Sequence, residues 1–148
     1  MNLVFSIGHS DHTADAFVAL LARHGVTAVA DVRAAPYSRH HPQFSKAALI
    51  ATLRAAGLAY VYLGEQLGGL PSARVRGQMQ GSGYAAMAAT EAFQEGIARV
   101  GQGRERHRIA LMASEVFKPQ TLFLLEHDPK LRLYIEALII DYEAALHM

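Results

Sequence analysis

The feature that most constrains the fold is a regular alternation of short apolar runs with amphipathic helical segments. Apolar runs at residues 3–7, 26–32, 58–63 and 108–113 predict four strands. Helical spacing of apolar side chains separates the first three runs, and the two helical segments end before Gly25 and Gly57, as helices with a glycine cap do. This alternation predicts an α/β fold, with parallel strands in one sheet and helices on its faces.

The remaining chain predicts a glycine-rich loop at residues 64–83, a third helix at residues 84–100 and a helical C-terminus. Asp128 and Pro129 suit the start of a helix, and the apolar residues after them recur at helical spacing: Leu131, Tyr134, Ile135, Leu138, Ile139 and Tyr142. This face either packs on the chain's own sheet or forms a homodimer. We expect one domain over residues 1–148, with an α/β core at residues 1–115 and a divergent helical tail at residues 116–148.

Composition excludes several classes of protein. The 148 residues hold no cysteine, so disulfides and thiol chemistry are excluded. No apolar run reaches the roughly 20 residues that span a bilayer, and the N-terminal sequence does not resemble a signal peptide. We therefore expect a cytoplasmic protein without membrane contact. A formal charge of +1 does not favour a nucleic-acid binder, although Arg39, Arg74, Arg76 and the basic segment 104–108 leave that alternative open.

Polar residues follow each predicted strand at its carboxyl end, where open parallel sheets bind their ligands. Gly8-His9-Ser10 follows the first strand, Asp31 and Arg33 the second, Gly64-Glu65 the third and Ser114-Glu115 the fourth. Since these ends meet at one edge, the sequence predicts a single cleft. Glu115 and His9 are the candidates for proton transfer there.

Gly8, His9 and Ser10 lie between a strand and a helix, where a helix N-terminus favours an anion. We interpret Gly8 and Ser10 as ligand-binding residues and His9 as a catalytic one. The alternative is that Ser10 or Thr13 only caps the helix.

Asp31 and Arg33 are two residues apart on an extended segment and therefore point to one face. In the functional interpretation Arg33 holds an anionic group, while Asp31 is a catalytic residue that orients a base or an arginine. In the alternative the two side chains only pair with each other, because a buried carboxylate needs a partner.

The loops contribute the other candidates. Ser38 and Arg39 precede His40 and His41, and Tyr84 lies beside the glycine-rich segment. We assign Ser38, Arg39 and Tyr84 to ligand binding. The spacing of the histidines is not that of a metal site, and no cofactor-binding motif is present, so we expect neither a metal nor a cofactor.

These segments together resemble the family called domain of unknown function 488, which includes YeaO-like proteins. The resemblance covers about residues 3–115 and rests on an ordered set of motifs: Ser6-Ile7-Gly8-His9-Ser10, Asp31-Val32-Arg33, Pro42-Gln43-Phe44, Gly57-Leu58-Ala59-Tyr60, Leu67-Gly68-Gly69, Gly83-Tyr84 and Ile109-Ala110-Leu111-Met112. It implies a Rossmann-like sheet of four or five strands, and a pocket with His9, Ser10, Asp31, Arg33, Ser38, Arg39, Tyr84 and Glu115. It implies no reaction.

The chain departs from this resemblance at its fourth strand. Ala113 stands where relatives carry a cysteine, and no Cys-His-Arg follows it. Either the family's catalytic groups have been lost or the C-terminal segment has been replaced. We therefore expect an enzyme-like domain that binds a small anionic, phosphate- or nucleotide-like ligand, with its activity altered or lost. A non-catalytic interaction or dimerisation module is the alternative.

Overall fold

Four parallel strands form the centre of the molecule. The computed structural model describes residues 4–9 and 11–113 of the 148-residue chain. The strands are β1 (Val4–Gly8), β2 (Ala28–Asp31), β3 (Ala59–Tyr62) and β4 (Ile109–Ala113), in the order β1-β4-β2-β3. All three strand pairs are parallel, and Ala30 lies between Val61 of β3 and Leu111 of β4.

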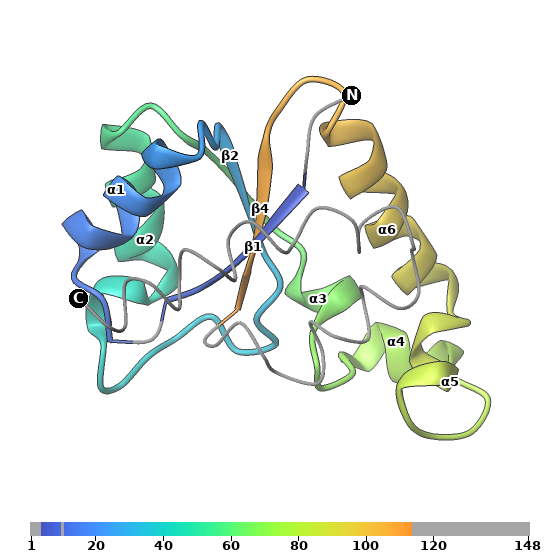
Figure 1. Cartoon of the computed structure of the whole chain (residues 1–148). Coiled ribbons are helices and arrows are strands. Elements are labelled where there is room, and N and C mark those ends of the chain that lie inside the picture. Colours follow the sequence, from blue (N-terminus) through green and yellow to red (C-terminus); the bar gives the residue numbers. More distant parts are fainter. Residues whose placement is uncertain (1–3, 10, 114–148) are drawn as a thin grey trace.

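Helices cover both faces of this sheet (Figure 1). Helices α1 (Ala14–Arg23) and α2 (Lys46–Ala55) lie on one face, and the single turn η1 (Pro42–Phe44) precedes α2. The other face carries α3 (Gly64–Leu67), α4 (Ala73–Gln78), α5 (Tyr84–Ala88) and α6 (Glu91–Gly103). The predicted α/β class, with a parallel sheet flanked by helices, is confirmed.

The ends of α1 and α2 are confirmed where the sequence placed them. The Thr13 hydroxyl accepts the Ala16 N–H at the start of α1. Gly25 follows α1 and Gly57 follows α2, with φ values of 67° and 76°. This left-handed conformation is costly for residues with a side chain, so glycine ends each helix with little strain.

Two predictions for the middle of the chain were wrong. The segment expected to be one helix at residues 84–100 is two helices, α5 and α6, because Thr90 caps α6 by accepting the Phe93 N–H. The segment expected to be a loop at 64–83 contains α3 and α4. Ser72 caps α4, and α3 begins at Gly64, where a side chain would collide with the Arg33 carbonyl.

Two apolar cores lie on opposite faces of the sheet, because successive strand residues point to opposite sides. The core beneath α1 and α2 contains Phe5, Ile7, Phe17, Leu20, Leu21, Val26, Val29, Phe44, Leu49, Leu53, Ala110 and Met112. The core on the side of α6 contains Val4, Ala28, Ala30, Val32, Leu63, Leu67, Ala88, Phe93, Val100, Ile109, Leu111 and Ala113.

Within the described part of the chain, none of the helices has the length and apolar character that crossing a membrane requires. The predicted C-terminal helix and the homodimer that it would form lie outside the described residues, as do Ser10 and Glu115.

Candidate functional site

A buried ion pair lies at the carboxyl end of β2. Asp31 accepts two guanidinium hydrogen bonds from Arg33, from Nε to Oδ1 at 2.9 Å and from Nη2 to Oδ2 at 2.8 Å. The side chains of Arg33 and Asp31 are 6% and 0% exposed. The pairing that the sequence analysis gave as the alternative for these two side chains is therefore present, in the forked geometry that is the strongest form of such contacts.

Two further donors complete the environment of Asp31. The Arg33 N–H donates to Oδ1 at 3.1 Å, and the Tyr60 hydroxyl donates to Oδ2 at 2.7 Å. Each carboxylate oxygen thus accepts two hydrogen bonds, which is the number of its lone pairs. Both carboxylate oxygens of Asp31 are therefore fully occupied by Arg33 and Tyr60.

Phe44 joins the ion pair to His9. Its carbonyl oxygen accepts a hydrogen bond from Arg33 Nη1 at 2.6 Å, and its ring stacks on the His9 ring with a centroid distance of 4.6 Å. Phe17 of α1 packs edge-on against the Phe44 ring at 5.1 Å and holds it in the core. His9 and Arg33 come from two strand ends and both contact Phe44, and Asp31 is joined to them through Arg33.

The loop between β2 and α2 lies beside this group. The Ser38 hydroxyl accepts the His41 N–H at 2.9 Å, and the Ser45 hydroxyl accepts the Ser38 N–H at 3.1 Å. These bonds fix the loop so that the His41 ring lies 6.3 Å from the His9 ring. Arg39 lies at the exposed surface of the same loop.

The last residue of β3, Tyr62, and Gly64 just after this strand hold the backbone of Arg33 in place. The Tyr62 hydroxyl donates to the Arg33 carbonyl at 2.7 Å, and Lys46 lies over the Tyr62 ring at 4.6 Å. Gly64 approaches the same carbonyl so closely that no Cβ would fit. Backbone and side chain of Arg33 are therefore both fixed.

Burial and the neighbouring Asp31 make the hydroxyls of two tyrosines harder to ionise. Burial, followed by the hydrogen bond to Asp31, raises the pKa of Tyr60 well above its ordinary value. Burial, followed by the charge of Asp31, also raises the pKa of Tyr62. Both hydroxyls therefore stay protonated, and able to donate a hydrogen bond, to a higher pH than an exposed tyrosine would.

Two further predicted site residues, Gly8 and Tyr84, lie on β1 and α5 rather than on the strand that carries Asp31. Gly8 is the last residue of β1, opposite Ala113 of β4. Tyr84 begins α5 on the opposite side of the sheet from α1 and α2, and its side chain lies outside the described residues (Figure 1). Within residues 4–9 and 11–113, no group of three or more His, Asp or Glu side chains is arranged to hold a metal ion.

Sequence reasoning placed neither Phe44 nor Tyr60 among the site residues. Phe44 is buried and contacts both Arg33 and His9. The available signal was its place in Pro42-Gln43-Phe44, after the polar loop. Tyr60 shares a strand face with Tyr62, but only the pairing of β2 with β3 brings its hydroxyl to Asp31.

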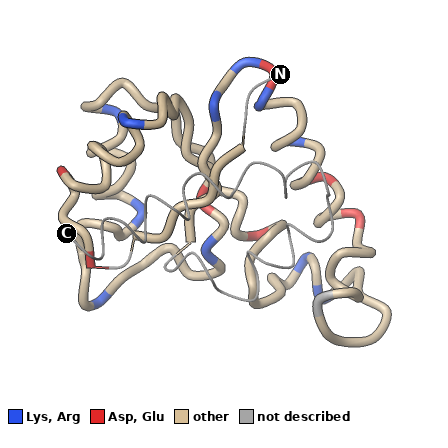
Figure 2. The backbone as a smooth tube through the Cα atoms, in the orientation of Figure 1, with Lys and Arg blue, Asp and Glu red and all other residues tan. Residues whose placement is uncertain are grey.

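The arginines suggested for nucleic acid do not form one exposed patch. Arg74 pairs with Glu95 at 2.6 Å, Arg104 is buried, and Arg108 donates to the His24 carbonyl and lies over the Phe5 ring. Figure 2 shows Lys and Arg distributed over both helical layers of the described chain. This distribution gives the nucleic-acid alternative no support.

Comparison with known proteins identifies a family. The model of the family described as "Domain of unknown function DUF488" matches residues 13–118. This range includes every residue of the ion-pair network around Asp31. No curated protein and no solved structure matches the chain.

Proposed function

This chain therefore belongs to the DUF488 family, and from that premise we propose that it binds a small anionic, phosphate- or nucleotide-like ligand beside Arg33. The observation that carries the proposal is the buried Asp31–Arg33 pair, whose members are 0% and 6% exposed. Transfer of two charges from water costs several kcal/mol per ion, and well-packed apolar residues often serve stability equally well. The pair is therefore better explained by binding than by stability.

Arg33 retains hydrogen-bonding capacity for a ligand. A guanidinium group has five N–H donors, and the bonds to Asp31 and Phe44 use three of them. The other two can point at a phosphate or carboxylate. Because Asp31 and Tyr62 already fix the group, little conformational entropy would be lost when an anion binds.

The connections of the sheet favour the same place. The chain leaves β2 toward α2 on one face and leaves the neighbouring β3 toward α3 on the other face (Figure 1). In open α/β sheets, ligands bind outside the carboxyl ends of strands at such a reversal. Arg33 and Gly64 follow β2 and β3 there.

We assign roles to the residues around this position. Arg33 is the fixed anion-binding group, Asp31 is its positioning residue, and Arg39 adds an exposed cation on the adjacent loop. His9 is the candidate for proton exchange with the bound ligand, since the ordinary pKa of histidine lies near neutrality. Gly8, Ser10, Ser38, Tyr84 and Glu115 remain proposed members of the site.

A thermal-shift titration tests this proposal. Inorganic phosphate, a nucleoside monophosphate and a sugar phosphate are each added at constant ionic strength, so that screening does not change. We expect at least one of them to raise the Tm in a saturable manner, because a ligand that binds only the folded state stabilises it. If no anion raises the Tm above that in a chloride control, the proposal is wrong.

Matched variants locate the effect. Arg39→Gln removes an exposed cation beside the site, and Arg76→Gln removes an exposed cation on α4, across the sheet. We expect Arg39→Gln to weaken the response to the anion and Arg76→Gln to leave it unchanged. Equal responses of the two variants would contradict the assignment.

A further inference from the structure

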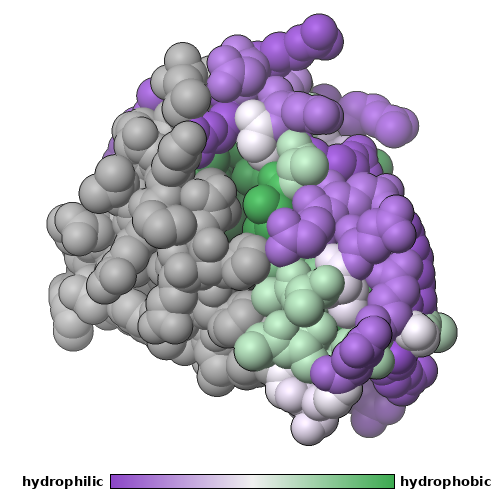
Figure 3. Space-filling model, turned by 90° about the vertical axis from the view of Figure 1, so that its right-hand side faces the viewer, coloured by the Kyte–Doolittle hydropathy of each residue, from purple (hydrophilic) through white to green (hydrophobic). Residues whose placement is uncertain are grey.

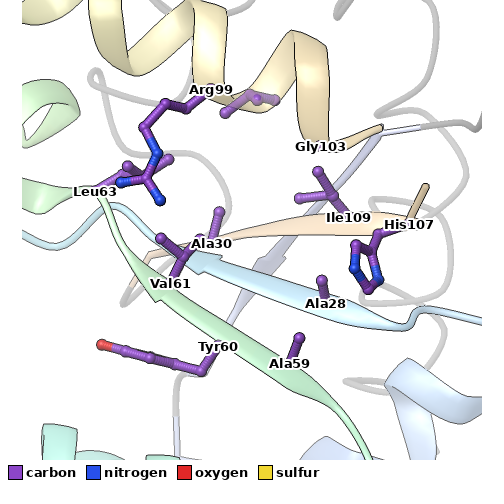
Figure 4. A pocket seen from close by; sticks show the side chains of 11 residues that line it. Ala28, Ala30, Ala59, Tyr60, Val61, Leu63, Arg99, Gly103, His107 and Ile109 are labelled. Carbon is purple, nitrogen blue, oxygen red and sulfur yellow. The ribbon is translucent and has the colours of Figure 1, made fainter. Parts of the chain in front are cut away.

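A hollow of about 190 Å³ lies on the face of the sheet opposite to the ion pair. Figure 4 shows it between β3, β2 and the end of α6. Its walls are mainly small or apolar residues: Ala28, Ala30, Ala59, Val61, Leu63, Val100, Gly103 and Ile109, with Tyr60, Arg99 and His107 at its margins.

Small residues on two neighbouring strands create this space. Ala28, Ala30 and Ala59 occupy positions that in parallel sheets are often Val, Ile or Leu. The end of α6 lies close to β4: a Cβ placed on Gly103 would come within 2.9 Å of the Ile109 side chain. This contact limits how closely the end of α6 approaches the sheet, and space remains over β2 and β3.

One cation lies at the margin of this apolar space. Arg99 extends from α6 toward one end of the hollow, near Leu63 and Val61 (Figure 4). Glu95, one helical turn earlier, is bound by Arg74 at 2.6 Å. The lining contains no carboxylate from the described chain. His107, at the other end, is held by Thr27 through Nδ1 at 3.0 Å.

We propose that this hollow binds a small monocarboxylate with an aromatic or branched apolar body. An apolar protein cavity of about 150 Å³ is known to accept benzene, so a hollow of about 190 Å³ suits a ligand of benzoate size. The apolar body replaces water against the alanine and valine side chains. The carboxylate forms a charge-assisted bond with Arg99 and so fixes the orientation of the ligand.

Benzoate is the probe for this proposal. It is titrated into the full chain while the backbone amides are followed by two-dimensional NMR. We expect saturable shifts at Ala30, Val61, Leu63 and Val100, and much smaller shifts with benzamide, which has the same ring without the charge. Absence of shifts at these four amides at millimolar benzoate overturns the proposal, whether the hollow stays empty or residues 114–148 fill it.

Two arginine variants separate a specific carboxylate contact from general charge. Arg99→Gln keeps the length of the side chain but removes its charge, and we expect it to weaken benzoate binding at least tenfold. Arg106→Gln removes an exposed cation that does not line the hollow, and we expect less than a twofold change. Equal affinity in Arg99→Gln and the unsubstituted chain contradicts the proposal.

Discussion

The two faces of the sheet bury different kinds of side chain and are packed to different degrees. Beneath α1 and α2, buried rings surround a buried ion pair, and each charge has its partner at 2.8–2.9 Å. On the side of α6 the strand residues are mostly small and apolar, and a hollow of about 190 Å³ remains between sheet and helix. On the outer side of α6, hydrophilic side chains cover much of the described surface (Figure 3).

Adjacent residues of one strand belong to these two environments. Asp31 points toward Tyr60 and Arg33, whereas Ala30 points into the hollow (Figure 4). The alternation of a strand places the two side chains on opposite faces. The first face is held by fixed polar contacts, and we expect the second face, which contains the hollow, to tolerate changes in side-chain volume better.

The largest expected effect comes from breaking the ion pair. Asp31→Ala leaves the Arg33 guanidinium buried without its carboxylate, and such a loss costs about 3–5 kcal/mol of unfolding free energy. Urea denaturation measures the change. The control is Glu95→Ala, which breaks the exposed Arg74–Glu95 pair and should lower the unfolding free energy far less. Similar costs for the two variants would refute the distinction between the buried and the exposed pair.

Two replacements of alanine by valine, one on each face of the sheet, compare the packing of the two faces. Ala110→Val adds two methyl groups between Phe5 and Val29 in the filled core and should cost about 1–3 kcal/mol. Ala30→Val adds the same groups where the hollow can receive them and should cost less than about 1 kcal/mol. Thermal denaturation of both variants checks this order, and the reverse order would show that the hollow is not available.

A smaller effect on stability is expected from the Tyr60 hydroxyl, at the edge of the face that carries the Asp31–Arg33 pair. Tyr60→Phe removes the hydroxyl that donates to Asp31 and should cost about 1–1.5 kcal/mol, since Tyr60 is only partly buried. Tyr37 is 75% exposed, so Tyr37→Phe should change stability by less than about 0.5 kcal/mol. A Tyr60→Phe variant as stable as Tyr37→Phe would mean that the hydrogen bond contributes nothing.

Alkaline pH provides a titration of the same contact. Because the pKa of Tyr60 is raised in the folded state, the unfolded chain loses this proton first as the pH passes about 10. The folded state then holds more protons, so stability should fall as pH rises above about 10. Urea midpoints measured between pH 8 and 11 should fall less steeply in Tyr60→Phe than in Tyr37→Phe, and parallel curves would argue against the shift.

The sequence predicted local structure better than distant contacts. Thr13, Gly25 and Gly57 marked helix ends because capping depends on neighbouring residues. The alternation of strands and helices indicated the parallel sheet. The break at Thr90 was missed because the apolar spacing continues across it, while the cap itself depends on one hydroxyl.

Part of the candidate site was predictable for a geometric reason. Residues that follow parallel strands lie at one edge of the sheet. From the sequence alone, His9, Asp31 and Arg33 could therefore be expected to lie near one another. The contributions of Phe44 and Tyr60 depend on loop conformation and strand order, and local patterns do not specify these. The hollow depends on how closely α6 approaches the sheet, which composition does not reveal.

The most direct test of the central claim is to locate bound phosphate by NMR in the full chain. The account predicts saturable shifts of the His9 ring protons and of the Arg33 Nε–H signal, with the amides of Ala30 and Val100 unmoved. Shifts confined to the face of α6, or no saturable shift at His9 and Arg33, would contradict it.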